Sequence, residues 1–171
     1  MANTYYLIES VTITSAGGAA SVSFNSIPQT YTDLVLMVSA RSSYGGVGDD
    51  IYIDFNGTTT SRTGRFFYGN GSGTAGTTTP ARRLGTNTAD SSTANVFGSI
   101  NAHIFNYTGS TNKIFISNSV SENNATTAYQ DLHFGLWSSA SPITSIQVSV
   151  GAGGGVLKQN STFTLYGIKN S

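Results

Sequence analysis

Cysteine is absent from this 171-residue chain, and charged side chains are scarce. Without cysteine the chain has no disulfides and no thiolate metal ligands. Charged residues make up 9% of the sequence, against about a quarter in an average domain, and eight basic side chains balance eight acidic ones. Because a nucleic-acid-binding protein needs a basic field to neutralise phosphates, we expect no nucleic-acid partner.

Long hydrophobic runs are missing as well. No segment approaches the roughly 18 consecutive apolar residues of a membrane-spanning helix, so we expect no membrane partner. No window of the sequence has a convincing helical period either. The chain instead contains short segments in which apolar and polar residues alternate, separated by glycine, serine and asparagine.

These alternating segments predict β-strands, because successive side chains of a strand point to opposite faces. The clearest of them lie at 10–14, 20–25, 33–40, 51–55, 99–107, 112–120, 131–137, 143–150 and 161–168. Strands without helices between them pair in antiparallel fashion. We therefore predict an all-β fold with essentially no helix: an antiparallel two-sheet sandwich, jelly-roll-like, of about 8–10 strands.

One domain is expected over 1–171, with a long irregular surface loop at about 69–98. Residues 69–98 are mostly small and polar, and they show no clear alternation. A loop of this length inside a compact domain is usually functional or disordered. We expect it to lie along the surface and to become ordered against a neighbouring molecule.

The segment 131–137, DLHFGLW, most resembles a reactive site. Its alternation places Leu132, Phe134 and Leu136 on one face, and we assign these three to the core. Asp131 and His133 share the opposite face. No third ligand joins them to complete a zinc site, so we expect a polar pair on the surface.

No catalytic motif is present elsewhere. The two glutamates, Glu9 and Glu122, are far apart in the sequence, and nothing places them as the carboxylate pair of a glycosidase. The acidic cluster Asp49, Asp50 and Asp54 could offer oxygens to calcium, but it lacks the spacing of a calcium loop, so we favour a solvated start of a strand. We predict no enzymatic activity, no catalytic residue, no metal and no cofactor.

Partner binding is the remaining class of function, and arginine and tyrosine are the residues we consider for it. Arginine is enriched at protein interfaces. Four arginines lie in or near the 69–98 segment, and Tyr44 in the turn SSYGGVG is the tyrosine that we most expect to be exposed. The predicted partner-binding residues are Arg62, Arg65, Arg82, Arg83 and Tyr44.

Several longer segments resemble a known group of proteins. They are the opening YYLIESVTI, then SFNSIPQTYTDLVLMVSAR, STNKIFISNSVSENNATTAYQDLHFGLWSS and PITSIQV, and the terminal FTLYGIK. Together they resemble small virion proteins of tailed bacteriophages. The resemblance covers most of the chain, and 69–98 is its least recognisable part. It implies a structural, jelly-roll-like domain that assembles as a trimer and serves as a capsid decoration (cement) protein or as a tail-fibre or receptor-binding part.

The resemblance leads to an expected location and partner. We expect a non-enzymatic structural protein on the exterior of the capsid or tail of a virion, bound to the major capsid protein or another virion protein. The chain begins and ends in expected strands without an adaptor or shaft, which favours capsid decoration over a tail fibre. The alternative is a tail-fibre or receptor-binding module that recognises a carbohydrate, such as a glycan of the host surface.

Overall fold

The computed structural model describes residues 4–71, 73–78, 82–125, 128–151 and 153–169. Among these residues there is no helix, and hence none that could span a membrane. The described residues form twelve strands: β1 (Tyr5–Thr12), β2 (Ser21–Phe24), β3 (Asp33–Ala40), β4 (Gly48–Phe55), β5 (Arg62–Gly69), β6 (Thr74–Thr78), β7 (Arg83–Thr88), β8 (Gly98–Phe105), β9 (Lys113–Glu122), β10 (Ala128–Trp137), β11 (Ile146–Val150) and β12 (Thr162–Ile168).

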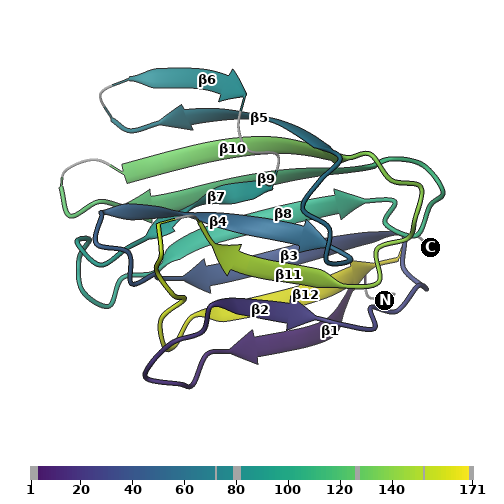
Figure 1. Ribbon diagram of the computed structural model, residues 1–171, viewed down its shortest axis with the longest axis horizontal. Helices are drawn as coiled ribbons and strands as arrows, with labels where there is room; N and C mark the ends of the chain where they lie inside the picture. The colour runs from purple at the N-terminus through teal and green to yellow at the C-terminus, as the bar shows by residue number, and fades with distance from the viewer. Residues whose placement is uncertain (1–3, 72, 79–81, 126–127, 152, 170–171) are drawn as a thin grey trace.

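Two antiparallel sheets face each other (Figure 1). The large sheet has eight strands in the order β1-β12-β3-β8-β9-β10-β5-β6, and the small sheet has four in the order β2-β11-β4-β7. The strands β1-β12-β3-β8 and β2-β11-β4-β7 are the two four-stranded halves of a jelly roll, between which the chain alternates. The predicted all-β, antiparallel, jelly-roll-like sandwich is confirmed, with twelve strands among the described residues where about 8–10 were expected.

Two hairpins extend the large sheet beyond the jelly roll. The pair β5-β6 is inserted between β4 and β7, and the pair β9-β10 is inserted between β8 and β11. Both join the large sheet on the same side of β8, so that this sheet has twice as many strands as the one it faces. Figure 1 shows β10, β5 and β6 above the small sheet, whose last strand, β7, packs against β8, β9 and β10.

The hydrophobic core lies between the jelly-roll halves. The alternation predicted for 51–55, 99–107 and 143–150 is confirmed, because the apolar residue at every second position is buried or, at Val150, half-buried. Each fully buried side chain of this size contributes roughly 1.5–3 kcal/mol. The completely buried members from the two sheets include Phe24, Leu34, Leu36, Ile51, Ile53, Phe55, Ile104, Ile146, Val148, Phe163 and Leu165.

The assignment of Leu132, Phe134 and Leu136 to the core is wrong. Leu132 and Phe134 are 37% and 41% exposed, and Leu136 is half-buried. The opposite side of β10 faces inward, where Trp137 packs against Phe55 with ring centroids 5.7 Å apart. Both faces of β10 carry apolar residues, so alternation alone does not determine which of them is buried.

The irregular loop expected at 69–98 is also wrong for much of its length, because it contains β6 and β7. Residues 84–89 are buried. The small residues that suggested a loop are needed for close packing between the sheets: a Cβ on Gly85 would lie 2.5 Å from the Cβ of Ser119 on β9. Residues 72 and 79–81 of this segment lie outside the described residues.

The loop after β7 is held by Arg41, a buried arginine that directly follows β3. The Arg41 guanidinium donates to the carbonyl oxygens of Thr93 at 2.7 Å and Val96 at 3.0 Å. It also donates to those of Asp90 at 3.2 Å and Ser92 at 3.0 Å. Four carbonyl partners replace the water that this side chain, 5% exposed, has lost.

A glycine substitution tests the inward face of β10. A Cβ at Gly135 would overlap the ring of Phe115, which is itself packed edge-on against Phe55. We expect Gly135→Ala to destabilise the protein by about 1–3 kcal/mol, because the packed ring has no free space to move into. Gly45→Ala is the matched control, since nothing lies within 4 Å of its Cβ position. Equal denaturation midpoints for the two variants would contradict the described orientation of β10.

Candidate functional site

The face of the large sheet that turns away from the small sheet carries a group of apolar side chains. In the strand register Phe134 lies opposite Ile116 on one side and Arg65 on the other. Leu136 lies opposite Ile114, which in turn lies opposite Phe105. We call this group the outer patch: Phe105, Ile114, Ile116, Phe134 and Leu136, contributed by β8, β9 and β10.

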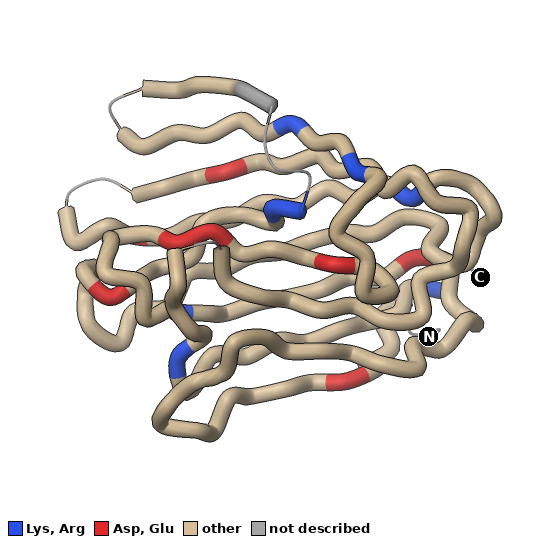
Figure 2. Tube along the Cα trace, in the orientation of Figure 1, with Lys and Arg blue, Asp and Glu red and all other residues tan. Residues whose placement is uncertain are grey.

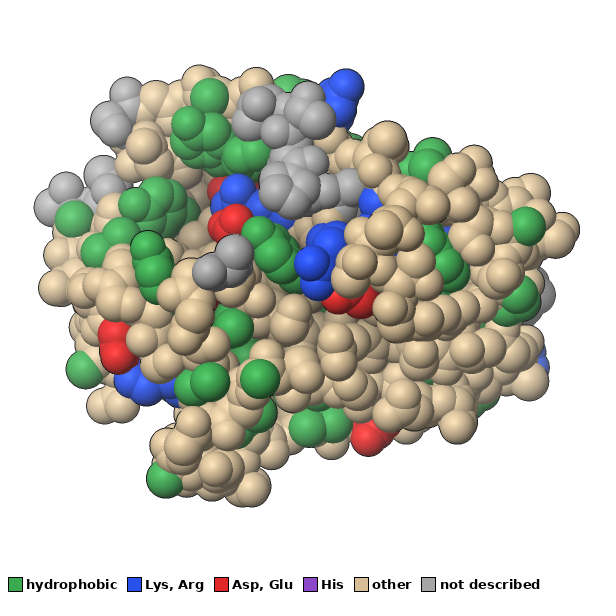
Figure 3. Space-filling view, viewed as in Figure 1, with side chains coloured by type: hydrophobic (Ala, Val, Ile, Leu, Met, Phe, Trp, Pro, Cys, Tyr) green, Lys and Arg blue, Asp and Glu red, His purple; other side chains and the backbone are tan. Residues whose placement is uncertain are grey.

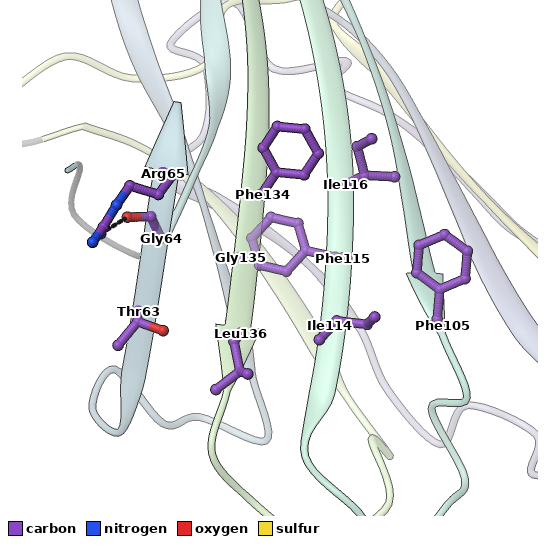
Figure 4. Close-up of a pocket in the computed structure, with 10 residues that line it drawn as sticks. All are labelled: Thr63, Gly64, Arg65, Phe105, Ile114, Phe115, Ile116, Phe134, Gly135 and Leu136. Carbon is purple, nitrogen blue, oxygen red and sulfur yellow. Dashed lines mark hydrogen bonds between the residues drawn. The ribbon is translucent and has the colours of Figure 1, made fainter. Parts of the chain in front are cut away.

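The outer patch surrounds a hollow of about 680 Å³. Figure 4 shows its side chains on neighbouring strands, with Thr63 and Arg65 of β5 on one side and Phe105 of β8 on the other. Gly64 and Gly135 lie directly opposite each other in the strand register and line the hollow without side chains. The patch therefore has apolar walls and a depression between them.

The outer patch is exposed. Ile114 is 51% exposed and Phe134 41% exposed. Elsewhere on this face, Phe67 of β5 and Val120 of β9 are 57% and 50% exposed. Soluble monomers rarely expose continuous apolar patches of more than a few hundred Å², and larger ones mark interaction surfaces. This surface is chemically suited to packing against another apolar surface.

A second hollow, which we call the inner groove, lies on the other face of the same strands. It has a volume of about 530 Å³ and is formed where the large sheet extends past the edge of the small sheet. Figure 3 shows this side of the molecule, where hydrophobic side chains flank charged groups of both signs. The inner groove is lined by Tyr44, Gly46, Val47, Gly48, Asp50, Phe66, Tyr68, Arg83, Thr86, Tyr129 and Asp131.

Arg83 is the central charge of the inner groove. Its Nη2 lies 3.0 Å from Asp50 Oδ1 and 3.2 Å from Asp131 Oδ2. Its guanidinium carbon stands 4.7 Å from the centre of the Phe66 ring. Figure 2 places the charged residues of β4, β7 and β10 in this part of the molecule. One arginine thus links carboxylates from both sheets.

The two carboxylates differ in environment. Asp131 Oδ2 accepts hydrogen bonds from the hydroxyls of Thr86 at 2.6 Å and Ser119 at 3.3 Å, and its residue is 3% exposed. Burial raises the pKa of Asp131, but His133, Thr86 and Arg83 together lower that pKa below its ordinary value. For Asp50, burial outweighs the charge of Arg83 and raises the pKa. Asp131 is committed to internal contacts, and Asp50 is the carboxylate that faces the groove.

His133 lies behind the groove and is buried. It is 1% exposed and stacks on Phe66 with ring centroids 5.1 Å apart. Its Nε2 is 3.8 Å from Asp131 Oδ2, which is too long for a hydrogen bond. The expected surface polar pair of Asp131 and His133 is therefore wrong: the pair faces the interior. The described part of the chain has no group of three histidine or acidic residues able to hold a metal.

Asp54 forms ion pairs with two of the predicted partner-binding arginines, Arg62 and Arg82. Arg82 forms a two-pronged pair with it, with Nε at 2.7 Å from Oδ1 and Nη2 at 2.5 Å from Oδ2. Arg62 lies 3.8 Å from Asp54, and its side chain is 2% exposed. Burial lowers the pKa of Arg62 to about 10, against the opposing effect of Asp54. Because Asp49 and Asp54 are buried, the expected solvated strand start is wrong at these two positions.

The five predicted partner-binding residues thus fall in three places. Arg62 and Arg82 lie at Asp54, Arg83 and Tyr44 line the inner groove, and Arg65 lies at the edge of the outer patch. Their role in docking stays a prediction. The sequence analysis missed β5, and with it the position of Phe66 and Tyr68. The apolar pair FF within RTGRFFYG was the available signal, although its alternation is poor.

The lowered pKa of Asp131 gives a pH-dependent prediction. A carboxyl group whose pKa is lower in the folded protein stabilises it at neutral pH, and that stabilisation is lost as the pH falls. We expect Asp131→Asn to cost about 1.5–3 kcal/mol at neutral pH, the value of hydrogen bonds to a charged group. The deficit should shrink below about pH 4, where the unfolded carboxyl is protonated.

The measurement is the free energy of unfolding from denaturant titrations between neutral and acidic pH. Asp90→Asn is the control, because Asp90 is an exposed carboxylate paired only with Lys158 in the described structure. An exposed pair contributes about 0–1 kcal/mol. A deficit for Asp131→Asn that stays constant with pH would contradict the network described above.

Comparison with known proteins does not assign the chain to a family. It matches no protein-family model, and it matches no curated protein.

Proposed function

We propose that this protein is a non-enzymatic structural protein of a bacteriophage virion, and specifically a capsid decoration (cement) protein that binds the assembled head and stabilises it. The outer patch is the observation that carries the proposal. It provides an exposed apolar surface on three neighbouring hydrogen-bonded strands, β8, β9 and β10, with β5 beside them. A surface of this kind needs a partner, and a capsid offers many identical ones.

The size of the exposed face supports the proposal. Strands lie about 4.8 Å apart and rise about 3.3 Å per residue. Eight strands of about eight residues therefore span roughly 1,000 Å². A standard protein interface buries about 800 Å² on each partner, so the large sheet has room for one.

The distribution of polarity on this face also supports it. One row across the sheet runs from Thr164 through Met37, Asn101 and Asn118 to Leu132. A neighbouring row runs from Thr162 through Ser39 and Ser99 to Val120, so the β12-β3-β8 side is more polar than the β9-β10 side, which also carries the outer patch. Interfaces combine an apolar centre with a polar rim and few charges at the centre. The arrangement favours a neutral protein surface, such as that of the major capsid protein, as the partner.

Self-association belongs to the same proposal. The formal net charge is zero, which favours association over solubility as a monomer. We propose a homotrimer as the decorating unit, on the strength of the resemblance to small virion proteins. In this trimer each copy turns its outer patch toward the capsid, and the copies contact one another through other surfaces.

Binding to undecorated heads tests the proposal. Purified protein should sediment with heads of the phage that encodes it, in a saturable ratio, and should raise the temperature at which the heads open. Phe134→Ser combined with Ile114→Thr should weaken binding about tenfold or more, because each buried side chain contributes roughly 1.5–3 kcal/mol. Both residues are exposed, so the substitutions should leave folding intact.

Val96→Thr is the control for this experiment. Val96 is also an exposed apolar residue, 36% accessible, but it lies in the loop after β7 and not on the large sheet. Its substitution should leave head binding unchanged. Failure of the protein to bind heads, or equal binding by the double variant and the wild type, would refute the proposed docking.

A further inference from the structure

The inner groove lies on the opposite face of the large sheet from the outer patch. It is formed by the inward faces of β10 and β5 and by the edge of the small sheet. A partner covering the outer patch would therefore leave the inner groove open to solvent. The groove can act independently of the proposed capsid contact.

We propose that the inner groove binds a neutral glycan, with a sugar ring placed between its tyrosines and over Arg83 and Asp50. The volume of about 530 Å³ falls within the roughly 300–1,000 Å³ of small-ligand sites. Such sites combine apolar and aromatic walls with a few fixed polar groups. The inner groove has both components.

The charges of the groove favour a neutral ligand. An anion would meet the carboxylate of Asp50 and, behind it, that of Asp131. A cation would meet the guanidinium of Arg83. The hydroxyl groups of a neutral ligand suit both Arg83 and Asp50, since a hydroxyl can accept a hydrogen bond from Arg83 and donate one to Asp50. Arg83 lines the groove, and its side chain is 14% exposed, so its guanidinium can be reached from the groove.

The aromatic walls favour a sugar among neutral ligands. Tyr44, Tyr68 and Tyr129 all line the groove, and none of the three is fully buried. A tyrosine offers a flat apolar face together with a hydroxyl. The ring of a sugar has the complementary arrangement, with C–H groups on its faces and hydroxyls on its rim.

The position of Tyr44 is fixed by glycines. A Cβ on Gly46 would lie 2.6 Å from the Tyr44 ring, and one on Gly153 would lie 2.7 Å from it. The ring thus lies against both glycines, where no other residue would leave room. A binding wall held in one orientation loses little conformational entropy when a ligand binds.

An array of polysaccharides tests the inference with the isolated protein. The probes are neutral bacterial polysaccharides, with alginate as the anionic and chitosan as the cationic comparison. We expect retention on at least one neutral polysaccharide and none on alginate or chitosan. Because no capsid is present, this result is independent of whether the protein decorates heads.

Variants locate the binding site. Tyr68→Ala and Tyr129→Ala should each reduce affinity at least tenfold, and Tyr129→Phe should retain most of it, since the ring face remains. Tyr5→Ala is the control, because Tyr5 is an exposed tyrosine, 54% accessible, on the other face of the large sheet. Asp50→Asn serves as a further variant. It should fold, because burial already disfavours the charge of Asp50. It should bind the glycan more weakly, because an amide oxygen accepts a hydrogen bond from a sugar hydroxyl less strongly than a carboxylate does.

Three results would overturn the inference. The first is retention on none of the neutral polysaccharides. The second is preferential binding to alginate or chitosan. The third is neutral-glycan binding that survives Tyr68→Ala, Tyr129→Ala and Asp50→Asn, which would place the sugar elsewhere on the molecule.

Discussion

The two sheets of this protein can cover each other only where both have strands, and they differ twofold in width. The small sheet covers the jelly-roll half of the large sheet and, through β7, packs against β9 and β10, while β5 and β6 extend past it. The inward faces of β9 and β10 are buried, partly against β7, whereas their outward faces carry exposed apolar side chains such as Ile114 and Phe134. The same mismatch produces the exposed outer patch on one side and the inner groove on the other.

The chain has few charged side chains, and several of them are buried. Lys113 is fully buried, and its ammonium donates to the carbonyl oxygens of Gly109 at 2.6 Å and Thr111 at 2.5 Å. Burial lowers the pKa of Lys113. Arg41 and Asp131 are likewise enclosed and fixed by hydrogen bonds. Removing one partner from such a group is costly, so these residues constrain the fold while leaving a nearly neutral exterior.

The sequence predicted the class of fold because its alternating segments are short, regular and free of helical pattern. It did not predict the orientation of β10, since Phe134 and Trp137 are both apolar and the choice between them depends on the width of the opposite sheet. Nor did it reveal β7, where residue 85 is a glycine because Ser119 of β9 leaves no room for a side chain. Arg83 was chosen as a docking residue, yet its contacts with Asp50 and Asp131 require residues that are distant in sequence.

The orientation of β10 can be measured directly, because the chain has no cysteine of its own. Single substitutions Leu132→Cys, His133→Cys and Phe134→Cys would be labelled with a thiol reagent in the free, folded protein. Rapid labelling at 132 and 134 with strong protection at 133 is the predicted result, since Leu132 and Phe134 are exposed and His133 is buried. Protection at 132 and 134 together with rapid labelling at 133 would contradict the uncovered apolar face from which the proposed assembly role is argued.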